Sequence, residues 1–213
     1  MGYLMKMIVA VTGASGSIYG ARFLEVLHEA YPEVETHLVV SRAGRRVLCH
    51  ETHYDVNDLA RWAGTVHNET DIGAEPASGS AGFDAMAIVP CSVKTLGQVA
   101  SGTGDTLIGR AADVVLKEGR RLVLVVREMP LSAIHLESML KLSRLGVMIL
   151  PASPGFYFYP KKISDLVDHV VGKTLNSMGL EQNLFEKWKG QTANRTVSSI
   201  LSDEFEDGAE SIG

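Results

Sequence analysis

The sequence predicts an α/β fold in which a parallel, doubly wound sheet lies between two layers of helices in a single domain. Three observations predict it. Apolar, β-branched runs alternate with segments of helical spacing along most of the chain, which is the pattern of strands joined by helical crossovers. The length of 213 residues suits one domain with a sizeable core and is short for two. The apolar fraction of 46% and the charged fraction of 21% are ordinary for a globular protein.

The first half of the chain contains two clear strands, each followed by a helix. The run MIVAVT is short, apolar and rich in β-branched residues, as expected of a buried first strand, and ETHLVVS is predicted to be the second. Periodicity is weaker between residues 51 and 82. The expected elements are strands at Met7–Thr12 and Glu35–Ser41, helices at Ile18–Ala30, Arg42–Cys49 and Asn57–Ala63, and a polar loop ending at Ala77–Ser80.

The second half repeats the alternation, and its run RLVLVV is apolar enough for the centre of a sheet. Residues 1–188 are expected to form the α/β domain, with Trp188 near the end of the final helix. Residues 189–213 are polar and acidic, which predicts a mobile tail. The expected elements are strands at Asp84–Pro90, Arg121–Val126 and Val147–Leu150, and helices from Ser92 and at Ala111–Lys117, Ile134–Ser143 and Ile163–Met178.

Charge and cysteine content exclude several classes of function. Twenty Lys and Arg residues against 25 Asp and Glu residues give a net charge of -5, so no general affinity for nucleic acid is expected. The two cysteines, Cys49 and Cys91, have neither metal-ligand nor disulfide spacing, and no metal site is predicted. No signal peptide and no apolar run of membrane-spanning length are seen. A cytoplasmic protein is therefore expected.

The loop TGASGS directly after the first strand is the strongest local signal for a ligand site. Gly13 and Gly16 allow the backbone to approach a phosphate closely, and Ser15 adds a hydroxyl. The following helix begins near Ser17 and offers unpaired N–H groups to an anion. A tight turn with a helix cap would explain the same residues without a ligand.

The same loop also resembles the TGxxxGxG motif of short-chain dehydrogenases. Tyr157 and Lys161 have the YxxxK spacing that those enzymes place on a helix. Pro154 precedes this tyrosine and Pro160 lies within the motif, which disfavours a helix there. Ser41–Arg42 would suit the phosphate of NADP, so the dehydrogenase alternative stays open.

A second loop, from Pro90 to Thr95, follows the third clear strand and opens a helix. Ser92 is well placed to cap that helix, which alone would explain the residue. Its hydroxyl and the N–H groups that follow are also suited to bind ligand oxygens. Because both loops follow strand ends, one cofactor spanning a shared crevice is the simpler interpretation.

Charged residues gather further along the chain. Arg110 and Lys117 are seven residues apart, so on one helix they share a face, which is usually a solvated surface. Arg127 and Glu128 close an apolar strand. The arginine suits recognition of a phosphate, and the glutamate suits proton transfer. These residues predict a site for a small anion.

The segment PASPGFYFYP combines prolines, a glycine and four aromatic residues, which is typical of a rigid apolar loop. It is suited equally to cover the sheet as a hydrophobic plug and to form one wall of an apolar ligand site. Trp188 adds a further flat surface, which is more often part of a core than of a site.

Six segments of this chain, taken in order, resemble the UbiX/Pad1 flavin prenyltransferases. They are TGASGSIYG, ASGS, PCSVKTL, GRAADVVLKE, VREMPLSAIHLESMLKLSRLG and PASPGFYFYP, and the resemblance runs from about Met7 to Trp188. It implies a flavodoxin-like or Rossmann-like fold and a homododecamer that binds FMN between subunits. The implied reaction joins the dimethylallyl group of dimethylallyl phosphate, without a metal, to N5 and C6 of reduced FMN. The product, prenylated FMN, would serve a UbiD-type decarboxylase.

The resemblance also implies roles for individual residues. The FMN-binding positions match Gly13, Ala14, Ser15, Ser41, Ser92, Val93, Lys94, Thr95 and Arg127. The positions around the prenyl phosphate match Tyr157, Arg110, Lys117, Lys173 and Trp188. The polar residues that handle the leaving phosphate and the protons match Ser15, Glu51 and Glu128, assisted by the basic pair Arg110 and Lys117.

One departure and two alternatives remain. Lys173 stands where the family has an arginine; it keeps the charge but loses the bidentate fork, which leaves open whether the donor is a mono- or a diphosphate. A flavin-dependent cysteine decarboxylase of the phosphopantothenoylcysteine type would share the cofactor, although PCSVKT replaces its PASANT motif. A non-catalytic flavin-binding protein would not need the acidic and cationic residues.

Overall fold

The computed structural model describes residues 4–186 and residue 188. The predicted tail lies outside these residues. The strands are β1 (Met5–Val11), β2 (Val34–Val40), β3 (Thr65–His67), β4 (Ala85–Cys91), β5 (Arg121–Val126) and β6 (Met148–Pro151). The helices are α1 (Ser17–Ala30), α2 (Arg42–Glu51), α3 (Val56–Arg61), α4 (Val93–Ser101), α5 (Leu107–Lys117), α6 (Ala133–Arg144) and α7 (Ile163–Met178), with 3₁₀ turns at Glu75–Ala77 and Gly79–Ala81.

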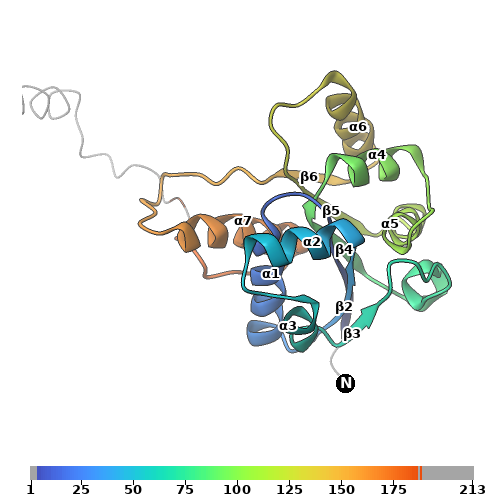
Figure 1. Cartoon of the computed structure of the whole chain (residues 1–213), viewed down its shortest axis with the longest axis horizontal. Coiled ribbons are helices and arrows are strands. Elements are labelled where there is room, and N and C mark those ends of the chain that lie inside the picture. Colours follow the sequence, from blue (N-terminus) through green and yellow to red (C-terminus); the bar gives the residue numbers. More distant parts are fainter. Residues whose placement is uncertain (1–3, 187, 189–213) are drawn as a thin grey trace, which may run out of the picture.

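The strands form one parallel, 6-stranded sheet in the order β3-β2-β1-β4-β5-β6. Helices α1, α3 and α7 cover one face and α4, α5 and α6 the other, while α2 runs across the carboxyl edge (Figure 1). The strand order reverses between β1 and β4, and in such sheets ligands bind at the carboxyl end of this switch point. The predicted doubly wound α/β fold is confirmed.

Alternation along β1 explains why the sheet has a core on each face. Met7, Val9 and Val11 pack against α1 and α7, whereas Ile8 and Ala10 face α4 and α5. Successive side chains of a strand point to opposite faces, so a strand buried on both sides must be apolar throughout. All residues of β4 are buried for the same reason.

Three features differ from the sequence-based expectations. Strand β3 was not expected, because it is three residues long, largely exposed and without a recognisable period. Helix α5 begins at Leu107, four residues before the predicted start, because Thr106 caps it by accepting a hydrogen bond from the Gly109 N–H. The placement of Trp188 near the end of the final helix is wrong, since α7 ends at Met178.

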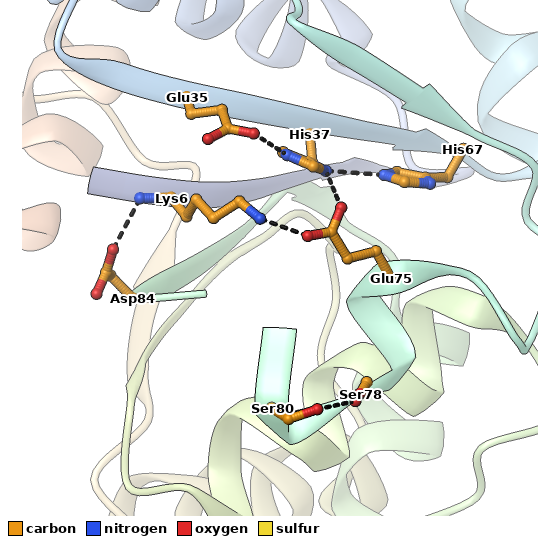
Figure 2. A network of polar contacts seen from close by, with 8 residues as sticks. All are labelled: Lys6, Glu35, His37, His67, Glu75, Ser78, Ser80 and Asp84. Carbon is orange, nitrogen blue, oxygen red and sulfur yellow. Dashed lines mark hydrogen bonds and ion pairs between the residues drawn. The ribbon is translucent and has the colours of Figure 1, made fainter. Parts of the chain in front are cut away.

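The segment after β3 is tied to the sheet by a network of polar contacts (Figure 2). The buried His37 ring on β2 lies between Glu35, at 2.9 Å from Nε2, and His67 of β3, at 2.9 Å from Nδ1. Glu75 lies 3.9 Å from the same ring and forms an ion pair with Lys6 of β1. The network thus joins β1, β2, β3 and the first 3₁₀ turn.

Candidate active site

Thr12, at the end of β1, holds together the two loops that the sequence singled out. Its hydroxyl donates to the Pro90 carbonyl at 2.7 Å and accepts from the Ser92 N–H at 2.9 Å. Thr12 is 1% exposed, so both bonds are shielded from water. The prediction that the two loops share a crevice is confirmed, and the residue that joins them was missed.

Helix α2 lies directly on the glycine loop. A side chain at Gly13 would overlap the Ala43 side chain, and one at Gly44 would come within 2.5 Å of the Val11 carbonyl oxygen. Only glycine permits this close approach. Ser41 caps α2 by accepting a hydrogen bond from the Gly44 N–H at 2.9 Å. The start of α2 is thereby fixed at the carboxyl edge of the sheet.

A pocket of about 350 Å³, called here the strand-end pocket, opens at this edge. The N-terminal ends of α2, α4 and α5 all contribute to its wall, and helix N-termini carry unpaired N–H groups and a partial positive charge. Its lining includes the predicted Gly13, Ser41, Ser92, Lys94 and Thr95, and also Arg42, Ala43, Arg46, Glu69, Gln98, Thr106 and Ile108. Its hydroxyls, amide donors and three basic side chains suit a phosphate-bearing ligand.

Some residues of this pocket were missed at the sequence level. Arg46 lies one helical turn beyond Arg42, so a basic stripe facing the pocket was available as a signal. Glu69 is different, because no local pattern marked it. Its carboxylate accepts from the Arg42 N–H at 2.6 Å, and its carbonyl accepts from the Leu107 N–H. It therefore bridges the starts of α2 and α5.

Two of the remaining predicted FMN positions do not line the pocket but are next in sequence to residues that do. Ala14 lies beside Gly13 in the glycine loop and is 4% exposed, and Val93 is the first residue of α4. The Ser92 hydroxyl accepts from the Thr95 N–H at 3.3 Å, which orders the first turn of α4. Neither Ala14 nor Val93 offers a side-chain donor, so a ligand would meet only their backbone groups and apolar surface.

Glu51 closes the glycine loop from the far end of α2. Its carboxylate accepts from the backbone N–H groups of Gly16 at 2.8 Å and Ser17 at 3.3 Å. Burial raises the pKa of Glu51, but hydrogen bonds from the Ser15 hydroxyl and those N–H groups, together with the Arg127 charge, outweigh it and lower the pKa below the usual glutamate value. Glu51 is therefore a carboxylate at neutral pH and acts as an acceptor.

Arg127, after β5, reaches the same loop from the other side. Its Nε donates to the Ser15 carbonyl at 3.0 Å. Glu128 is exposed beside it and lines a separate cavity of about 300 Å³ between the ends of β5 and β6, together with Met129 and Ser153. Arg127 lines this cavity too and does not line the strand-end pocket, so the predicted Arg–Glu pair faces one hollow beside the glycine loop.

Tyr157 lies in the segment between β6 and α7, which runs outward from the sheet (Figure 1). This segment is not helical, as its prolines predicted, so the YxxxK helix of a dehydrogenase is absent. The Trp188 ring lies 5.8 Å from that of Tyr157. The chain after α7 turns back and packs on Gly172, where the Cβ of any other residue would come within 2.6 Å of the Phe185 ring. Lys173 lies 5.9 Å above the Phe185 ring.

Arg110 and Lys117 do not line the strand-end pocket. Arg110 is exposed on the first turns of α5 and lies 3.8 Å from Asp113. Lys117 is at the other end of α5, where it forms an ion pair with Glu118 near Gly79. Seven residues of helix separate the pair by roughly 10 Å. Lys117 therefore lies toward the amino edge of the sheet, away from the pocket of its own chain.

Two features are absent from the described residues, 4–186 and 188. None of their helices is both long and apolar enough to cross a membrane. They contain no group of three or more His, Cys, Asp or Glu side chains arranged to hold a metal ion.

The fold and the strand-end pocket define a doubly wound α/β protein built to hold a phosphate-bearing cofactor at the switch point of its sheet. Comparison with known proteins narrows this class. The model of the Flavoprotein family matches residues 4–175. A probable UbiX-like flavin prenyltransferase of Escherichia coli O157:H7 is 49% identical over 194 residues, covering 91% of this chain and 98% of the relative.

Two solved structures extend the comparison. The dodecameric, FMN-dependent UbiX-like decarboxylase from Escherichia coli O157:H7 is 50% identical with a TM-score of 0.86, covering 87% of this chain and 100% of that one. AnUbiX (PadA1), solved with FMN and dimethylallyl pyrophosphate, is 45% identical with a TM-score of 0.85, covering 87% and 98%. The chain belongs to the UbiX/Pad1 flavin prenyltransferases within the Flavoprotein family.

Proposed function

We propose that this protein joins the dimethylallyl group of dimethylallyl phosphate to N5 and C6 of reduced FMN and so forms prenylated FMN. The observation that carries the proposal is the 49% identity to a flavin prenyltransferase over 91% of the chain, combined with a pocket lined by the matching motifs. Bound reduced FMN supplies the nucleophilic nitrogen and carbon of this reaction. The residues of the chain bind, orient and neutralise charge.

The strand-end pocket fits the phosphate of FMN. Its Ser41, Ser92 and Thr95 hydroxyls and its helix N-termini offer several donors to one dianion. Lys94 adds a cation at the start of α4. Arg127 stands over the glycine loop, where a planar donor group suits the polar edge of a flavin. The remaining proposed FMN-binding residues are Gly13, Ala14, Ser15 and Val93.

The dimethylallyl phosphate site is proposed near Tyr157, Lys173 and Trp188. Tyr157 offers a hydroxyl and aromatic surface, and Lys173 offers charge close to the same ring cluster. Such an arrangement shelters an allylic group while holding its phosphate. Arg110 and Lys117 are exposed and do not line the pocket of their own chain, so we assign them to the site of a neighbouring subunit. The described dodecamer of the Escherichia coli relative supports a shared site.

Proton handling is assigned to the two glutamates. Glu51 remains a carboxylate because its hydrogen bonds lower its pKa, and it fixes the Ser15 hydroxyl beside the glycine loop. Glu128 is exposed at the end of β5, where it is free to give and take a proton as the second flavin bond forms. The product would pass to a UbiD-type decarboxylase.

Anaerobic turnover tests the proposal. The protein is incubated with dimethylallyl phosphate in the presence and absence of reduced FMN, and inorganic phosphate is measured. Phosphate release that requires reduced FMN is the expected result. Release of CO₂ from a cysteinyl substrate, without phosphate release from either a mono- or a diphosphate donor, would contradict it and favour a cysteine decarboxylase. Flavin binding without any turnover would favour a binding protein.

A further inference from the structure

A buried histidine lies between the outward segment and α7. His169, on α7, is 5% exposed, and its ring stacks on Phe158 with centroids 5.1 Å apart and planes at 7°. Phe185 lies 4.6 Å away on the chain that returns after α7. The Tyr157 ring meets His169 edge-on at 5.7 Å. Packing from three sides fixes the plane of the imidazole.

The hydrogen bonds of this ring define which nitrogen carries the proton. The Gly155 N–H donates to Nδ1 of His169 at 3.3 Å, so Nδ1 must be the bare acceptor nitrogen. In a neutral imidazole the proton is then on Nε2. Nε2 lies 3.3 Å from the Tyr157 hydroxyl oxygen. The histidine therefore donates to the tyrosine, and the tyrosine oxygen accepts.

This direction determines what the Tyr157 hydroxyl is able to do. Because its oxygen accepts from Nε2, its own proton is directed elsewhere, and Tyr157 is 37% exposed. We infer that His169 is a positioning residue that makes Tyr157 a hydrogen-bond donor toward the phosphate of the prenyl donor. The inference rests on the proposed function, in which Tyr157 contacts that phosphate. A tyrosine that instead donated to the histidine would offer the phosphate only a lone pair.

The arrangement works only while His169 is neutral. Burial lowers the pKa of His169 below the usual histidine value, and the Lys173 ammonium on the same helix adds to this effect. The titratable groups that face the ring are Tyr157 from the outward segment and Lys173 from α7. A second proton would be placed on Nδ1, against the Gly155 N–H. Protonation would therefore break the bond that sets the ring and release the loop.

A double-mutant cycle tests the coupling between the two side chains. Tyr157→Phe, His169→Phe and the double variant are compared with the wild type. His169→Phe keeps the aromatic packing and removes both ring nitrogens. We expect it to raise the KM for dimethylallyl phosphate about tenfold, with the double variant no worse than Tyr157→Phe alone. If the increases in KM of the two single variants multiply in the double variant, the side chains act independently and the inference is overturned.

Two readouts separate positioning from a structural role. The Kd for FMN should stay within about twofold of the wild type in His169→Phe, because the strand-end pocket is untouched. His169→Gln, whose amide offers an acceptor to Gly155 and a donor to Tyr157, should recover most of the lost KM. The wild-type KM should rise as pH falls, and this rise should disappear in His169→Phe. Equal loss in the Phe and Gln variants, or a pH dependence that persists in His169→Phe, would overturn the inference.

The inference also has a test that does not depend on turnover. Solid-state NMR of the ¹⁵N-histidine-labelled protein, with His169→Phe used for assignment, reports which ring nitrogen carries the proton. A protonated Nε2 and a bare Nδ1 are expected, and the opposite tautomer would overturn the inference. If the wild type forms no prenylated flavin, the proposed function fails. If the wild type forms prenylated flavin and His169→Phe has the same KM for dimethylallyl phosphate as the wild type, only the role of His169 fails.

Discussion

Replacing Thr12 by valine tests whether the crevice depends on the bridge between its two loops. Valine keeps the shape of the side chain and removes its hydroxyl. The Pro90 carbonyl then loses one of two donors, because it still accepts from the Thr12 N–H at 3.2 Å. The Ser92 N–H loses the partner that the hydroxyl provided.

The structure gives the size of the effect. An N–H group left without a partner in a shielded position costs about 1–3 kcal/mol, and the lost second bond to the carbonyl costs about 0.5–1.5 kcal/mol. Thr12→Val should therefore lower the free energy of unfolding by about 1.5–4.5 kcal/mol. Because Ser92 opens α4 at the strand-end pocket, FMN affinity should fall about tenfold or more.

Urea unfolding and flavin fluorescence titration measure the two effects. Thr174→Val is the matched control, because Thr174 is fully buried and donates only to the Val170 carbonyl within α7. The free energy of unfolding of the control should fall by about 0.5–1.5 kcal/mol, and its FMN affinity should be unchanged. If Thr12→Val and Thr174→Val lose equal stability and both bind FMN like the wild type, the bridge has no role in the site.

Four further variants test three more predictions. Gly13→Ala should abolish FMN binding, because its methyl group would overlap Ala43 of α2. The control Gly97→Ala, which has open space around it in the interior of α4, should raise the melting temperature slightly. Flavin titration and thermal melts measure the two effects. Burial, and to a lesser extent a neighbouring histidine, lowers the pKa of His67, so the unfolded chain binds the proton first. The free energy of unfolding should thus fall as pH drops below about 6.5, and less steeply in His67→Gln; an unchanged slope would contradict this. Glu128→Gln should abolish prenyl transfer while FMN affinity is retained, and wild-type turnover in that variant would exclude its proton-transfer role.

Much of the fold was predictable because its signals are local. The apolar runs of β1, β4 and β5 had to be buried strands, and their alternation with helices required a parallel sheet. The cap of α5 at Thr106 was missed because it is a single residue in a polar loop. Strand β3 was missed because its pairing with β2 is a tertiary contact with no periodic signal.

The candidate site was predictable where one loop carries its chemistry. TGASGS and PCSVKT each combine a strand end, small residues and a helix start, so Gly13 and Ser92 could be assigned from the sequence. Glu69 enters the pocket only because the starts of α2, α4 and α5 converge. Sequence spacing placed Arg110 and Lys117 on one face of a helix. It did not show at which edge of the sheet that helix ends.

The central claim is tested most directly by the mass of the flavin after anaerobic incubation of the purified protein with reduced FMN and dimethylallyl phosphate. A flavin heavier by one five-carbon unit is the predicted result. Unchanged flavin, with the diphosphate donor also tried, would contradict the assignment of prenyl transfer to this chain.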